Sequence, residues 1–103
     1  MKLLMILSIA EYADEVRKMM TSNNVPVYSE TEMHGFHTKH HKPDMRSWFS
    51  QGDHGVYSTL FFSFQDSETV QRILDEVKQQ NEACSSERTN PFHAYVLDVE
   101  KHV

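Results

Sequence analysis

The sequence is poor in residues that cross-link or interrupt a fold, with one cysteine, three glycines and three prolines among 103 residues. The single Cys84 excludes an internal disulfide and fits a reducing compartment, so we expect a cytoplasmic protein. No apolar run is long enough to cross a bilayer, and we expect no direct membrane insertion. The apolar run from Lys2 to Ala10 leads straight into an acidic segment, which favours a buried first strand over a secretory signal.

Basic residues are also scarce. The net charge is −5, so the chain has no overall basic field to neutralise phosphates, and nucleic-acid binding is not expected. A chain of this length is predicted to form one domain, residues 1–103, with a single core that gains from oligomerisation.

The hydrophobic periodicity predicts six elements. Two amphipathic segments indicate helices, and four short runs rich in apolar and β-branched residues indicate strands. Their order predicts an α+β, ferredoxin-like βαββαβ fold, in which two helices cover one face of a four-stranded antiparallel sheet. A long loop, about residues 37–55, separates the second and third strands. The predicted elements are strand Lys2–Ile9, helix Tyr12–Ser22, strand Val27–Phe36, strand Val56–Phe64, a helix from Asp66 or Ser67 to near Ala83, and strand Phe92–Val99.

The face of the sheet away from the helices is predicted to be apolar. Both faces of the third strand carry large side chains, and we expect Tyr28, Phe36 and Phe61 on the uncovered face. Such a face is too apolar to meet water, so it indicates burial against another subunit.

The long loop and the end of the strand before it are rich in histidine, since five of the seven histidines lie from His34 to His54. Neutral imidazole is a ligand for Zn, Cu or Ni, so one reading is a metal site. The other is a solvated loop whose histidines bind nothing. Trp48 and Phe49, in the same loop, either fold back onto the core or anchor a partner protein. The candidate metal ligands are His34, His37, His40, His41 and His54.

Three segments carry a family resemblance. The helix contains Tyr-Ala-Asp-Glu-Val-Arg-Lys, the second strand reads Ser-Glu-Thr-Glu-Met-His-Gly-Phe up to Phe36, and the last strand reads Tyr-Val-Leu-Asp-Val-Glu from Tyr95. Together with the order of elements, these resemble a divergent member of the nitrogen-regulatory PII signalling proteins. The segment Thr89–His93 has none of the glycines found in that family's phosphate-binding loop.

The resemblance implies a homotrimer that binds a small ligand in clefts between subunits and acts on a membrane transporter or an enzyme through its long loop. Thr31, Gly35 and Phe36 would lie at the base of that loop, where the family holds adenine nucleotides. His93 falls where the family carries a phosphate-binding lysine.

Two other functions remain open at this point. One is a trimeric metal-binding protein of the copper-tolerance type that uses the histidine-rich loop. The other is a small dimeric ferredoxin-like oxygenase or isomerase. No Ser-His-Asp nucleophile motif is present, and we do not expect an enzyme.

Overall fold

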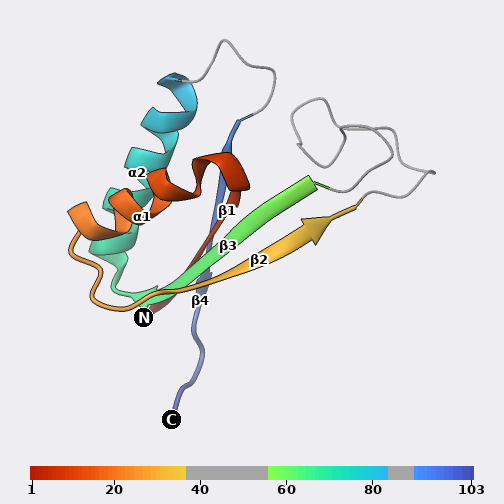
Figure 1. The fold of residues 1–103 in the computed structure, drawn as a ribbon. Coiled ribbons are helices and arrows are strands. Elements are labelled where there is room, and N and C mark those ends of the chain that lie inside the picture. Colours follow the sequence, from red (N-terminus) through yellow and green to blue (C-terminus); the bar gives the residue numbers. More distant parts are fainter. Residues whose placement is uncertain (37–55, 84–89) are drawn as a thin grey trace.

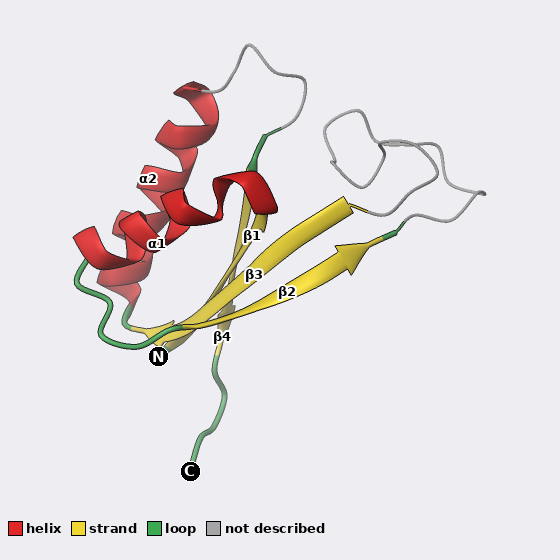
Figure 2. Ribbon diagram, in the orientation of Figure 1, coloured by secondary structure: helices red, strands yellow, loops and turns green. Residues whose placement is uncertain are grey.

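The computed structural model describes residues 1–36, 56–83 and 90–103. Four strands form one antiparallel sheet, and both helices lie on the same face of it (Figure 1, Figure 2). This confirms the predicted ferredoxin-like α+β fold. The elements are β1 (Lys2–Ile9), the 3₁₀ helix η1 (Ala10–Tyr12), α1 (Ala13–Ser22), β2 (Ser29–Gly35), β3 (Val56–Gln65), α2 (Ser67–Ala83) and β4 (Phe92–Asp98).

The helix α1 begins one residue later than predicted, because Tyr12 belongs to η1. Val16, Met19 and Met20 recur at helical spacing and are all buried against the sheet. The helix ends where Asn24 adopts a positive φ of 58°, a conformation that asparagine tolerates better than most residues. The asparagine pair therefore terminates α1, as its position in the sequence indicates.

Asp66 caps the N-terminus of α2. Its Oδ1 accepts a hydrogen bond of 2.7 Å from the backbone N–H of Thr69, which would otherwise have no partner inside the helix. This hydrogen bond is the main reason that the pKa of the Asp66 carboxyl lies below its usual range. Val70, Ile73 and Val77 form the buried side of α2 and complete the core.

The strand order is β2-β3-β1-β4, so β1 lies in the interior of the sheet. Alternate residues of β1, which include Leu4 and Ile6, are fully buried beneath the helices. The intervening residues Leu3, Met5 and Leu7 lie on the other face, which neither α1 nor α2 covers, and are half-buried. Met5 is therefore not part of the helix-covered core.

The structure corrects the predicted faces of β2 and β3. Phe61 is completely buried on the helix side, where it lies opposite Ile6 of β1, and Tyr28 packs partly against the same core. β2 begins at Ser29 rather than at Val27, and Val27 is 73% exposed. The error arose because apolar residues occupy both faces of β3, so alternation alone does not say which face the helices cover. Phe36 lies just beyond β2 and is exposed.

Candidate functional site

The face of the sheet opposite the helices, which we call the open face, carries a broad apolar surface. The register places residues from all four strands on it in rows that run across the sheet. Several are large and exposed: Phe64 is 52%, Tyr95 51% and Leu97 49% accessible. A surface of this kind is characteristic of an interface rather than of a face in contact with water. Its apolar members are Leu3, Met5, Leu7, Ile9, Met33, Leu60, Phe62, Phe64, Tyr95 and Leu97.

Two of the predicted ligand-binding residues lie in one row of the open face. Thr31 pairs with Leu60, Leu60 with Leu7, and Leu7 with His93. Thr31 and His93 are therefore on the two opposite edge strands, β2 and β4. Three inter-strand spacings separate them, a distance of about 14 Å. They share a face but do not form a single site within one subunit.

The other two predicted ligand-binding residues separate from each other. Gly35 is buried at the end of β2 and pairs with Val56. The Phe36 ring instead packs against the His34 ring, with centroids 4.6 Å apart. His34 follows Thr31 by three residues in β2, so its side chain lies on the opposite face of the strand, which is the helix side of the sheet. Phe36 is therefore grouped with His34 rather than with Thr31.

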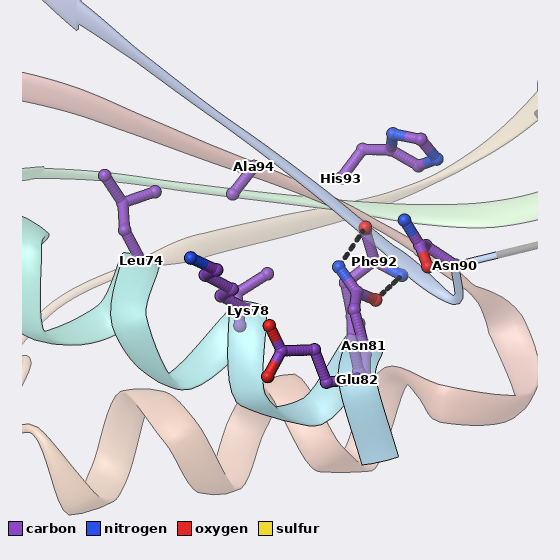
Figure 3. Close-up of a pocket in the computed structure, with 9 residues that line it drawn as sticks. Leu74, Lys78, Asn81, Glu82, Asn90, Phe92, His93 and Ala94 are labelled. Carbon is purple, nitrogen blue, oxygen red and sulfur yellow. Dashed lines mark hydrogen bonds between the residues drawn. The ribbon is translucent and has the colours of Figure 1, made fainter. Parts of the chain in front are cut away.

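The start of β4 is fixed by a side chain of α2. The Asn81 amide donates to the carbonyl oxygen of Phe92 at 3.0 Å, and the N–H of Phe92 donates to Asn81 Oδ1 at 3.2 Å (Figure 3). Beside this contact lies an open pocket of about 490 Å³ between α2 and β4, and His93 is part of its lining. The pocket is lined by Leu74, Val77, Lys78, Asn81, Glu82, Asn90, Phe92, His93 and Ala94.

An ion pair anchors β2 to α1. The Arg17 guanidinium donates to both carboxylate oxygens of Glu30, at 2.9 and 2.7 Å, and also to Asp14. It lies 5.8 Å from the centre of the Phe61 ring. The hydrogen bonds from Arg17 are the main reason that the pKa of the Glu30 carboxyl is lowered, and those to Glu30 and Asp14 raise the pKa of Arg17. Both groups remain charged through the physiological range.

Of the five candidate metal ligands, only His34 lies in the described part of the chain, where its ring stacks on Tyr57. Residues 1–36, 56–83 and 90–103 contain no group of three His, Cys, Asp or Glu side chains that could hold a metal ion. The remaining candidates lie outside the described residues, and so do the two aromatic residues predicted to contact a partner. They are His37, His40, His41, His54, Trp48 and Phe49.

Several residues that contribute to the open face, to the β4 contact with α2 or to the ring contact with His34 were not identified as site residues from the sequence. Asn81 gives no signal, because an asparagine near the end of a helix has many ordinary explanations. Tyr57 could have been paired with His34 only if the register of the two strands across the long loop were known. Leu7 and Leu60 are found as strand residues, but their row depends on the strand order.

No helix in the described ranges is long and apolar enough to span a bilayer. No protein-family profile and no curated protein matches the sequence. The fold is similar to the crystal structure of a protein from Thermus thermophilus that is described as a PII-like signalling protein. The TM-score is 0.63, with 17% sequence identity over 95% of this chain and 84% of that one. The chain therefore has the fold of this PII-like signalling protein.

Proposed function

We propose that this chain is a PII-like signalling subunit. In this proposal it forms a homotrimer, binds a small ligand between subunits, and regulates a transporter or an enzyme through the segment between β2 and β3. One observation carries the proposal: the open face of a PII-like fold is apolar and half exposed in a single subunit. Burying apolar surface stabilises association by roughly 25 cal/mol per Å² before the costs of association are subtracted.

The positions of Thr31 and His93 support a ligand site between subunits. A nucleotide that contacts both residues in one subunit would have to cross Leu60 and Leu7, over about 14 Å of apolar surface. A cyclic trimer instead brings one edge of each sheet toward the other edge of its neighbour. In this arrangement Thr31 of one subunit and His93 of the next contact the same adenine nucleotide, with Gly35 at the end of β2 leaving room for it.

Light scattering and calorimetry test the assembly and the ligand. We expect three times the subunit mass of 12.1 kDa, and ATP binding that weakens at least about tenfold in T31A and in H93A. H102A, a histidine change in the exposed C-terminal segment, is the matched control and should bind as the parent does. A monomer at micromolar concentration would contradict the assembly.

Mixed trimers test whether each site is shared. When T31A and H93A subunits are unfolded together and refolded, some clefts combine the intact Thr31 of one subunit with the intact His93 of another. We expect parent-like ATP affinity to return in a fraction of the sites. If both residues act within one subunit, mixing restores nothing. A T31A/H93A double variant refolded with T31A is the control, because none of its clefts has both residues.

The histidine-rich segment supplies a second class of ligand to test, a transition metal such as Zn, Cu or Ni. We expect a triple change of His37, His40 and His41 to alanine to abolish zinc binding without changing the mass of the assembly. Zinc affinity should fall as the pH drops, because protons compete for imidazole. Unchanged zinc affinity in the triple variant would remove this segment as a metal site.

A further inference from the structure

Three aromatic rings are clustered where β2 and β3 extend beyond the helices (Figure 1). His34 and Tyr57 are cross-strand partners, and their rings are parallel to within 8° with centroids 4.4 Å apart. Phe36 packs against the same His34 ring at 4.6 Å, tilted by 47°. We call His34, Phe36 and Tyr57 the aromatic stack. The contacts between these rings stabilise their arrangement.

The aromatic stack is largely open to water. Phe36 is 70% and Tyr57 69% exposed, whereas Thr59, the next residue of β3 on the same face, is only 5% exposed. The helical layer therefore ends between Thr59 and Tyr57. The stack also lies on the opposite face from Phe62 and Phe64, so a trimer that buries the open face leaves it accessible. Clustered exposed rings of this kind mark a binding surface more often than a solvated one.

A carboxylate lies on the same face of β2 as the His34 ring. Glu32 precedes His34 by two residues in β2, so both side chains are on the same face of the strand. Glu32 is exposed, and it forms no ion pair with any other residue in the described ranges. The described residues as a whole carry twelve Asp or Glu side chains against six Lys or Arg. This excess of negative charge favours the binding of a cation and disfavours that of a phosphate group.

The same hairpin already shows which cation such a site accepts. Two cross-strand pairs closer to the helices than His34 and Tyr57, Glu30 pairs with Phe61, and the Arg17 guanidinium contacts both of them. Arg17 donates two hydrogen bonds to the carboxylate and lies over the ring. Glu32 and Tyr57 also combine an acid and a ring at the exposed end of the hairpin, as diagonal neighbours, because Glu32 pairs with Thr59 and Tyr57 with His34. No arginine of the described ranges contacts them.

We infer that the aromatic stack and Glu32 bind an arginine side chain of a partner protein. The guanidinium stacks on Tyr57 and donates hydrogen bonds to the Glu32 carboxylate. Arginine fits better than lysine, because its planar group can do both at once. The site requires neither the trimer nor a bound nucleotide, since all four residues belong to one hairpin.

The probe is an acetylated and amidated Gly-Gly-Arg-Gly-Gly peptide, titrated into the full chain and followed by backbone NMR. We expect shifts centred on Glu32, His34 and Tyr57. The same peptide with citrulline in place of arginine has the shape without the charge and should produce none of them. E32Q and Y57L should each weaken binding by about fivefold. Y57F keeps the ring and should bind within about twofold of the parent.

E100Q is the control for charge, because it removes the same unit of charge in the C-terminal segment. That segment leaves the sheet away from the end of β2 and the start of β3 (Figure 1). Melting curves show whether each variant is folded. Equal binding of the arginine and citrulline peptides, or equal affinity of E32Q, Y57L and E100Q, would overturn the inference. Shifts confined to the open face would also overturn it. If R46Q bound the peptide at least about fivefold more tightly than the parent, the chain's own arginine would be the occupant and the partner assignment would fail.

Discussion

The two faces of the sheet are both apolar, but within the described residues only one of them is covered by helices. On the helix side, Leu4, Ile6 and Phe61 are completely buried beneath α1 and α2. On the open face, Phe64 and Leu97 keep about half of their surface in water. Hydrophobicity therefore does not by itself distinguish a core from an interface. The difference comes from where the chain places its two helices.

The largest loss of stability is expected from a substitution on the helix-covered face. Replacing Phe61 by alanine removes a fully buried ring and leaves a cavity beneath the helices. We expect the free energy of unfolding to fall by about 3–5 kcal/mol, measured by denaturant titration. A loss below about 1 kcal/mol would mean that the helices do not cover this face as described.

Charged substitutions on the open face are expected to change the stability of the subunit less, but to disrupt its assembly into a trimer. The double variant F64E/L97E puts two charges where an interface would have to desolvate them. We expect the mass to fall to that of one subunit while the circular dichroism spectrum keeps its shape. Y57E/Q79E adds the same two charges at exposed positions of β3 and α2 and should leave the mass unchanged. If both variants dissociated to the same extent, the open face would not be the surface through which the subunits assemble.

The smallest effect concerns the edge of the covered face, where Arg17 joins Glu30. The pKa of Glu30 is lower in the folded chain than its usual value, mainly through the Arg17 hydrogen bonds. Its contribution to stability is therefore complete above the unfolded-state pKa and is lost as the pH falls through the folded-state value. We expect E30Q to be less stable than the parent near neutral pH, with the two converging in acid. A difference that stays constant from neutral pH down to strongly acid solution would contradict this link, as thermal melts over that range would show.

The order of elements could be predicted from the sequence because each one has its own periodicity. The apolar run before Ala10 indicates an interior strand, and the spacing of Val70, Ile73 and Val77 indicates one face of a helix. The face that Phe61 occupies could not be predicted, because a strand that is apolar on both sides fits either orientation. The structure, rather than the pattern, assigns it.

The candidate site was predicted only in part, for a physical reason. Thr31 and His93 do share the open face, but which strands lie between them depends on the strand order, which no local pattern specifies. The aromatic stack depends on the pairing of His34 with Tyr57 across a long connection, and sequence periodicity carries no information about such a pairing. Most of the predicted histidine ligands lie outside the described residues and stay a prediction.

The position of β1 between β3 and β4 has a consequence for how the chain folds. Both neighbours of β1 come much later in the sequence, since Ile6 pairs with Phe61 on one side and with Ala94 on the other. The central strand is thus synthesised before either partner exists, and the sheet closes through contacts of large sequence separation. Such topologies fold slowly, because loop entropy is lost before the contacts form. Until β4 has been synthesised, we expect the nascent chain to expose the unpaired backbone edge of β1, which β4 covers in the folded sheet.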